Sequence, residues 1–312
     1  MEIETLYEMT SPSRDNFRIR GFKFGSGEKT VAIVGAMRGD EIQQQYLCAR
    51  LVNLLSNIEK DGQIARGKSV MVIPSCNPFS MNVNRRFWTM DNTDINRMFP
   101  GYDKGETTQR IAAALFEQLQ DYEYGLQMAS FYLPGDFVPH VRMLRTGYED
   151  VESARLFGFP FVTLRKPTPY DTTLLNYNWQ LWGVKAFSLY AGQTDHLKTE
   201  TCNQTIDSIL RFLGRIGVTN YRVWTAGYDS ILIDEEKLIN LTAHDAGIFY
   251  RYHNAGEQVR DGEKIGSIID PFDGSVREDF YAPSDGTIFF AHHMPLVLEH
   301  DIAFRIQPYG QE

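Results

Sequence analysis

The sequence predicts an α/β fold in which a mostly parallel sheet is flanked by helices, followed by a smaller all-β domain. Across residues 30–217, short apolar runs alternate with amphipathic helical stretches, the pattern of a helix-covered parallel sheet. Beyond residue 217 the helical period disappears, and short strand-like runs are separated by glycine and aspartate. We therefore expect two domains, residues 1–217 and residues 218–312.

Four strands are predicted from near-continuous apolar runs, which are typical of strands buried on both faces of a sheet. They cover residues 30–36 (TVAIVGA), 69–75 (SVMVIPS), 161–164 and 185–189. Three helices are predicted from apolar residues spaced three and four positions apart. They cover residues 41–57, 108–119 and 205–213. In the first helix the spaced residues are Ile42, Tyr46, Ala49, Val52 and Leu55.

The C-terminal region contains turns that resemble those of lipoyl-like barrel-sandwich hybrids. The resemblance rests on residues 246–249 (AGIF), 256–266 (GEQVRDGEKIG) and 282–288 (APSDGTI). Neither Met-Lys-Met nor Asp-Lys-Ala stands at the hairpin that would carry a swinging cofactor. We therefore expect this domain to have a structural or assembly role.

Composition excludes several classes of function. The chain has 312 residues and a formal net charge of -9, which argues against a nucleic-acid partner because phosphate binding needs a basic face. No segment approaches the roughly 20 apolar residues that span a bilayer, and the start shows no targeting segment. We expect a cytoplasmic protein with no membrane partner. Cys48, Cys76 and Cys202 show no paired spacing, so we expect buried, idle thiols.

A candidate site lies where the first predicted strand runs into a helix, at Arg38-Gly39-Asp40-Glu41. Such a turn lies at the carboxyl edge of the sheet, where open α/β folds bind their ligands. In a zinc peptidase, a His and a Glu three residues apart would bind the metal at this turn. Glu41 is present, but Arg38 takes the place of the His. A guanidinium has no lone pair to offer a metal and repels a dication.

With Asn77-Pro78, Arg86, residues 94–101 (DINRMFPG) and the later β-domain, the chain resembles the succinylglutamate desuccinylase/aspartoacylase branch of the zinc carboxypeptidases. The resemblance covers nearly the whole chain and implies a zinc-carboxypeptidase-like fold. In that family, Arg and Asn-Arg residues bind a substrate carboxylate and help to polarise the scissile carbonyl. The resemblance assigns these roles to Arg86, Asn96 and Arg97.

The residues that would perform the family's chemistry are replaced. The third zinc ligand of the family is a His in an Asp-Leu-His segment, and Gln127 stands there, whose amide offers a cation no charge. The catalytic Glu is replaced by Tyr190, and a phenol with a pKa of about 10 is no water-activating base at neutral pH. Glu41 is the only matching ligand, so we expect no bound metal and no catalytic residue.

Other histidines could rebuild a metal site. His140 is the nearest candidate, but we expect it to belong to a loop. His196 and Glu200 are four residues apart and could chelate if that stretch is helical, although a solvated pair is the preferred interpretation. His292 and His293 are adjacent on a predicted strand, so their side chains point to opposite faces and cannot chelate together.

The preferred function is a catalytically degenerate family member, a pseudoenzyme that binds a small anionic or amino-acid-like ligand and has no cofactor. It could equally act as the non-catalytic subunit of an active relative, in a homo-oligomer or hetero-oligomer. The expected binding residues are Arg38, Arg86, Asn96, Arg97, Gln127 and Tyr190.

The alternative is an active zinc-dependent deacylase or carboxypeptidase that hydrolyses an N-acyl amino acid or a peptide-like amide with ligands not yet identified. A purely structural subunit is a third interpretation.

One contact is predicted in detail: the Arg38 guanidinium occupies the position of the missing metal and pairs with Glu41.

Overall fold

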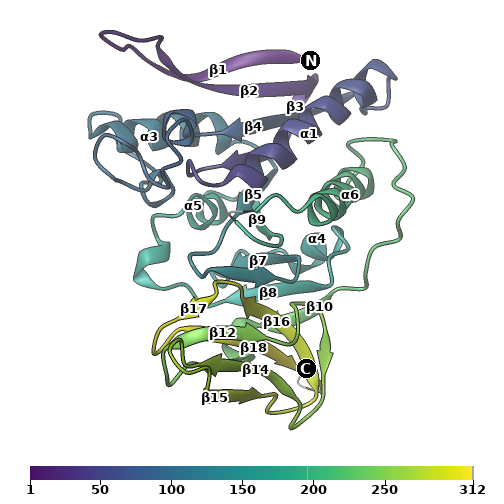
Figure 1. Ribbon diagram of the computed structural model, residues 1–312. Helices are drawn as coiled ribbons and strands as arrows, with labels where there is room; N and C mark the ends of the chain where they lie inside the picture. The colour runs from purple at the N-terminus through teal and green to yellow at the C-terminus, as the bar shows by residue number, and fades with distance from the viewer. Residues whose placement is uncertain (195, 311–312) are drawn as a thin grey trace.

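The computed structural model describes residues 1–194 and 196–310. A large mixed sheet runs through the upper and middle parts of the molecule in Figure 1, in the order β1-β2-β4-β3-β5-β9-β7-β8-β10. Its strands are β1 (Glu2–Met9), β2 (Phe17–Gly25), β3 (Gly27–Ala36), β4 (Gly67–Ser75), β5 (Tyr124–Ala129), β7 (His140–Leu144), β8 (Phe161–Arg165), β9 (Lys185–Tyr190) and β10 (Ile231–Asp234). The four predicted strands are confirmed as β3, β4, β8 and β9.

The centre of this sheet is parallel. β3 pairs in parallel with both β4 and β5, and β5 pairs in parallel with β9, whereas β7 joins β9 in the antiparallel direction. Residues 30–36 of β3 are all buried, because helices cover both faces. The parallel strands bring the carboxyl ends of β3, β5 and β9 to one edge, and the candidate site lies there.

Helices α1 (Ile42–Lys60), α4 (Val151–Arg155) and α6 (Thr199–Arg215) pack on one face, and α3 (Thr107–Leu119) and α5 (Leu175–Leu181) pack on the other. A short helix, α2 (Pro78–Met81), follows β4. The three predicted helices are confirmed as α1, α3 and α6, and α6 begins six residues earlier than expected.

The residues that α1 buries differ from the spaced apolar residues predicted to form its buried face. Ile42 is exposed, and the helix buries Gln43 and Gln44 beside its apolar residues. The Gln43 amide donates to the Ala191 carbonyl at 2.7 Å, and the Gln44 amide donates to the Ala129 carbonyl at 3.2 Å. These bonds give both buried Nε2 groups an acceptor and fix the start of α1 against the ends of β9 and β5.

The C-terminal region forms two antiparallel sheets around a core of its own. One contains β11 (Ile239–Thr242), β13 (Gln258–Val259), β16 (Gly286–His292) and β18 (Ile302–Pro308), and the other contains β12 (Gly247–Arg251), β14 (Lys264–Ile269), β15 (Val276–Tyr281) and β17 (Leu296–Val297). The expected architecture, an α/β sheet followed by a smaller β-domain, is confirmed.

The two regions exchange strands across the expected boundary. β10 lies after residue 217 but pairs with β8 in the large sheet. β6 (Gly135–Phe137) lies before it but pairs with β16. The division into residues 1–217 and 218–312 therefore stays a prediction.

Within the described residues, no helix combines the length and the apolar character that crossing a bilayer requires.

Candidate functional site

The turn between β3 and α1 folds the Glu41 carboxylate back against the chain. Glu41 accepts hydrogen bonds from the backbone N–H groups of Met37 at 2.8 Å and Arg38 at 3.0 Å, and from the Ser130 hydroxyl. Arg38 Nη1 donates to Glu41 Oε1 at 2.9 Å. Arg38 is 5% exposed and Glu41 is 1% exposed. The predicted ion pair between these residues is therefore confirmed.

A second carboxylate holds the opposite side of the Arg38 guanidinium. Asp94 Oδ2 accepts from Arg38 Nε at 3.1 Å and from Nη2 at 2.9 Å. Asp94 also caps the short helix η1 (Ile95–Arg97) through the Asn96 N–H. Burial alone would lower the pKa of Arg38, but the charges of Glu41 and Asp94 more than offset burial and raise it. Arg38 is therefore a permanent buried cation, and sequence analysis missed its second partner.

Tyr132 gathers the arginines of the site around one ring. The guanidinium carbons of Arg38, Arg86 and Arg97 lie 5.1, 4.6 and 5.6 Å from the ring centroid. Its hydroxyl donates to Asp94 Oδ2 at 2.7 Å. Such cation–π contacts stabilise a cluster of like charges. Tyr132 was not predicted, because nothing in the spacing of its loop marks it.

The carboxyl edge of the sheet brings most of the predicted site together. β5 places Gln127 beside β3, and β9 places Tyr190 beside Ala129. A cavity of about 350 Å³ opens at this edge and is lined by both side chains. Five of the six predicted binding residues line this cavity, namely Arg38, Asn96, Arg97, Gln127 and Tyr190.

Gln127 and Asn96 are bonded to each other, and Arg97 is held from outside the cavity. Gln127 Nε2 donates to Asn96 Oδ1 at 3.0 Å, and both side chains are buried. Arg97 Nη1 donates to the Tyr170 carbonyl at 3.0 Å. This bond fixes the long side chain of Arg97 with its guanidinium at the cavity wall.

Arg86 lies next to the cavity but does not line it. Its Nη1 donates to Asp40 Oδ2 at 2.9 Å, and its Nη2 donates to the Ser130 hydroxyl at 3.4 Å. Arg86 therefore reaches the site through its contacts with Tyr132 and Ser130. A role for Arg86 in binding stays a prediction.

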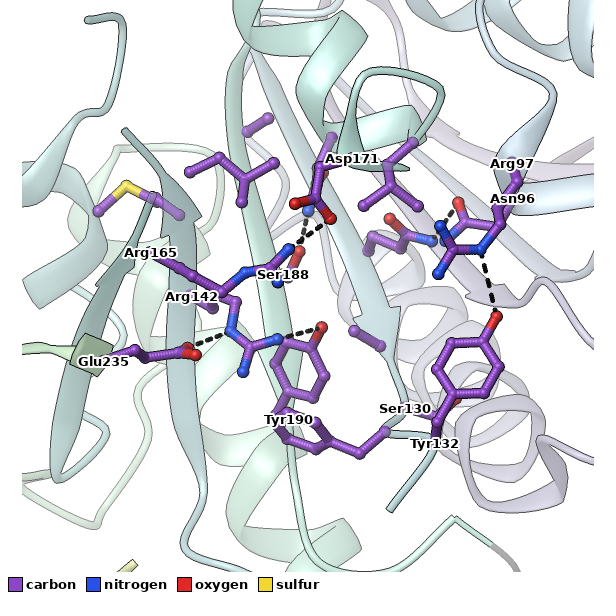
Figure 2. Close-up of a pocket in the computed structure, with 18 of the residues that line it drawn as sticks. Asn96, Arg97, Ser130, Tyr132, Arg142, Arg165, Asp171, Ser188, Tyr190 and Glu235 are labelled. Carbon is purple, nitrogen blue, oxygen red and sulfur yellow. Dashed lines mark hydrogen bonds and ion pairs between the residues drawn. The ribbon is translucent and has the colours of Figure 1, made fainter. Parts of the chain in front are cut away.

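Tyr190 belongs to a second buried ion-pair network, whose residues Arg142 and Glu235 lie at the left of Figure 2. Arg142 Nη1 donates to the Tyr190 hydroxyl at 2.9 Å, and Arg142 Nε donates to Glu235. The Arg142 guanidinium lies 4.5 and 4.4 Å from the ring centroids of Phe131 and Tyr190. Burial raises the pKa of Glu235, but the nearby Arg142 charge outweighs burial and holds it below its ordinary value. Sequence analysis named neither Arg142 nor Glu235.

His140 is the first residue of β7, so its expected place in a loop is wrong. Its Nδ1 bonds the Val138 carbonyl at 2.8 Å, and its ring stacks on Tyr190 with centroids 5.1 Å apart. Burial, reinforced by the Arg142 charge, lowers the pKa of His140 to about 3. His140 is therefore a neutral core residue packed behind Tyr190.

The remaining histidine candidates lie outside the cavity. α6 begins at Thr199, so His196 and Glu200 do not share a helical turn. His292 packs on Phe249 with ring centroids 5.6 Å apart, whereas the His293 ring lies 5.9 Å from that of His196. The two adjacent histidines thus contact different rings, although β16 ends at His292 and His293 lies beyond the strand on which both were expected.

The donor set does not fit the zinc site that the sequence resemblance implies. Over residues 1–194 and 196–310, no group of three or more His, Cys, Asp or Glu side chains is placed to hold a metal ion. At the turn itself, the Glu41 carboxylate is already bound by the Arg38 guanidinium and by neutral donors.

Cys48, Cys76 and Cys202 are buried, as expected.

Comparison with protein families identifies the larger part of the chain. Residues 27–215 match the model of the succinylglutamate desuccinylase/aspartoacylase catalytic domain. No curated protein matches the sequence.

Solved structures of similar fold cover almost the whole chain. A succinylglutamate desuccinylase/aspartoacylase from Rhodobacter sphaeroides is 21% identical, with a TM-score of 0.77, and the match covers 96% of this chain and 93% of that one. A succinylglutamate desuccinylase from Silicibacter sp. TM1040 is 17% identical, with a TM-score of 0.80 and coverage of 97% and 94%. The product-bound ectoine utilization protein EutE (DoeB) from Ruegeria pomeroyi is 16% identical, with a TM-score of 0.79 and coverage of 97% and 94%. At these identities the likeness shows the fold.

Proposed function

Because the chain belongs to the succinylglutamate desuccinylase/aspartoacylase family, we propose that it is a catalytically degenerate member that binds a small carboxylate or amino-acid-like ligand. The observation that carries the proposal is the Arg38 guanidinium held between Glu41 and Asp94. It puts a fixed monocation at the turn where the resemblance places a zinc dication. A guanidinium paired with two carboxylates neither acidifies a bound water nor leaves Glu41 free to bind metal. The cation left to bind a ligand carboxylate is Arg97 at the cavity wall.

Tyr190 supports the loss of hydrolysis. Its hydroxyl accepts a hydrogen bond from Arg142, and a phenol lacks the carboxylate that serves as the water-activating base at this position in the family. Without an activated water and a base, hydrolysis loses several powers of ten in rate. We therefore expect negligible turnover.

The chemistry of the cavity wall supports ligand binding. Asn96 and Arg97 lie together at the wall, and Arg97 is fixed there by the Tyr170 carbonyl. Gln180 lines the same cavity and is 1% exposed. Its amide donates to the Leu144 carbonyl at 3.0 Å, while its Oε1 has no partner among the described residues. A buried acceptor of this kind suits a ligand N–H, as in an amino acid or its N-acyl derivative.

A role as a non-catalytic subunit is part of the same proposal. Large apolar side chains are exposed on the β-domain, including Tyr250, Phe272, Leu296 and Leu298. Contiguous exposed apolar surface of this kind would favour association with another chain. Light scattering of the purified chain tests self-association, and mixing with an active relative tests the hetero-oligomer.

A thermal-shift screen tests the binding function. A ligand that binds only the folded state stabilises it, and the temperature midpoint of unfolding rises. At a ligand concentration a hundred times Kd, the stabilisation is about 2.7 kcal/mol. We expect at least one N-acyl amino acid or dicarboxylate to stabilise the wild type and to lose its effect in Arg97→Gln. Arg110→Gln, which removes an exposed arginine bonded to Thr107, is the matched control.

Two results would reject the proposal. One is that no carboxylate stabilises the wild type, and the other is that Arg97→Gln and Arg110→Gln respond alike. The alternative, an active zinc-dependent deacylase, requires release of product from an N-acyl amino acid in the presence of zinc. Chromatography of the reaction mixture measures this release directly.

A further inference from the structure

The outer face of one sheet of the β-domain carries an unbroken row of aliphatic side chains. This sheet has the strand order β15-β14-β12-β17 and lies at the end of the molecule opposite β1 in Figure 1. The register pairs Leu296 with Ile248, and Ile248 with Ile269. Ile269 in turn pairs with Val276. Paired residues on neighbouring strands point to the same face of a sheet, so the row crosses all four strands.

Three tyrosines continue this outer face beside the aliphatic row. Side chains alternate between the two faces along a strand. Phe249 is therefore turned into the core of the domain, while Ile248 and Tyr250 are exposed. Tyr252 follows on the same side, and its ring centroid lies 5.4 Å from that of Tyr250. Tyr281, at the end of β15, is exposed as well.

The polar groups of the outer face bond to one another. Ser267 is fully buried, donates to Asp279 Oδ1 at 2.7 Å and is hydrogen-bonded to the Tyr252 hydroxyl at 3.0 Å. Lys264 Nζ lies 2.8 Å from Asp279 Oδ1, and the Tyr281 hydroxyl donates to Asp279 Oδ2 at 3.4 Å. These groups keep their partners when water leaves. Covering the face therefore carries a small desolvation penalty.

The outer face is large enough for a stable interface. Six of its side chains are between 40% and 63% exposed, namely Ile248, Tyr250, Tyr252, Val276, Tyr281 and Leu296. With roughly 200 Å² for a whole aromatic side chain and somewhat less for an aliphatic one, they expose on the order of 600 Å². This is the upper end for an apolar patch on a monomer. It is also most of the roughly 800 Å² that each partner contributes to a stable complex.

The charges favour a second copy of this chain as the partner. The chain has a net charge of -9, so two copies repel each other over most of their surface. The charges that the register places on the outer face, Lys264 and Asp279, pair with each other. At its rim, Arg277 pairs with Asp270. Two copies can therefore meet at this face without bringing unpaired like charges together.

We propose that the chain forms a two-fold homodimer through this outer face. A two-fold axis sets the same surface of each copy against the other. The aliphatic row of one copy then packs on the tyrosines of its partner, and the reciprocal contact forms at the same time, as two sheets pack face to face. This inference rests on the subunit role in the proposed function and names the partner and the surface.

Sedimentation velocity tests the dimer over about 1–100 µM, where interfaces of this size associate. We expect the wild type to reach about twice 35.8 kDa within this range. Tyr250→Lys and Leu296→Lys each put an unpaired charge into the interface and should weaken dimerisation at least about 30-fold. Both side chains are exposed in the single chain, so each variant should fold, and its unfolding midpoint checks this.

Tyr148→Lys is the matched control. Tyr148 is 62% exposed, against 61% for Tyr250, and lies between β7 and α4 in the large domain. This variant should dimerise as the wild type does. None of the residues of the outer face lines the ligand cavity. The thermal shift produced by a carboxylate should therefore be the same in Tyr250→Lys and in the wild type.

The outcomes separate the dimer from the binding function. A wild type that stays monomeric up to about 100 µM overturns the inference, even when an active relative binds the outer face. A dimer that survives both Tyr250→Lys and Leu296→Lys, or one that Tyr148→Lys weakens equally, also overturns it. If the dimer responds as expected but no carboxylate stabilises the wild type, the binding function is wrong and the interface stands.

Discussion

Arg38 and Glu41 form a buried ion pair, with Arg38 Nη1 donating to Glu41 Oε1 at 2.9 Å. The pair closes the turn between β3 and α1 at the carboxyl edge of the large sheet. Asp94 binds the other side of the same guanidinium. One buried cation therefore holds together two segments of the site that are far apart in the sequence.

Arg38→Met is expected to destabilise the protein strongly. It leaves Glu41 and Asp94 buried without their cation, and breaking a buried pair from one side typically costs about 3–5 kcal/mol. Urea unfolding at neutral pH measures the change. The triple variant Arg38→Met, Glu41→Gln, Asp94→Asn, which also removes both charges, should recover part of the loss. A loss below about 1 kcal/mol for Arg38→Met would mean that the pair is not structural.

Gly39→Ala is expected to disturb the same turn by a steric clash, with no change of charge. An added Cβ would lie 2.3 Å from the Arg85 carbonyl oxygen and 2.5 Å from the Ser80 carbonyl carbon. Both are backbone atoms, so the turn must move, and overpacking of this kind costs about 1–3 kcal/mol. Gly214→Ala is the control, since its nearest neighbour would be 3.7 Å away. Equal unfolding midpoints for the two variants would contradict the prediction.

His140 is expected to make the fold sensitive to acid. Its pKa is about 3 in the folded protein, against an ordinary 6.5. Between these values the unfolded chain binds a proton that the folded protein does not, so stability falls as pH falls. The contribution approaches about 1.4 kcal/mol per pH unit in this window. Unfolding of the wild type and His140→Phe across this range should show a shallower slope for the variant. Parallel curves would contradict it.

Zinc binding is expected to be recoverable by two substitutions. Arg38→His together with Gln127→His restores, with Glu41, the three-ligand set that suits zinc. The Arg38→His single variant keeps only two ligands and should bind zinc much more weakly. Titration with zinc monitored by calorimetry compares the two. Equal affinities would show that Gln127 does not stand at a ligand position.

The sequence predicts strands with near-continuous apolar runs and misses several in which polar or charged residues interrupt the run. β7 contains Arg142, which interrupts its apolar run. This arginine can be buried because it donates hydrogen bonds to Glu235 and to the Tyr190 hydroxyl. β1 buries only Leu6 of its eight residues. Whether such segments form strands depends on contacts with residues distant in the sequence, so no local pattern could predict them.

The same limit applies to the site. The Arg38–Glu41 pair could be predicted because a spacing of three residues at a strand-to-helix turn brings the side chains together. Asp94 and Tyr132 are 56 and 94 residues from Arg38 along the chain. Arg142 and Glu235 are 93 residues apart. Only the assembled sheet and its connecting loops bring these groups into contact.

The most direct test of the account is the number of zinc ions bound per chain. Wild-type protein is incubated with excess zinc, dialysed against metal-free buffer and analysed by mass spectrometry for the metal, with Glu41→Ala treated in parallel. The account predicts no tightly bound zinc in either protein, because the Arg38 guanidinium holds Glu41. About one zinc per chain in the wild type, lost in Glu41→Ala, would contradict it.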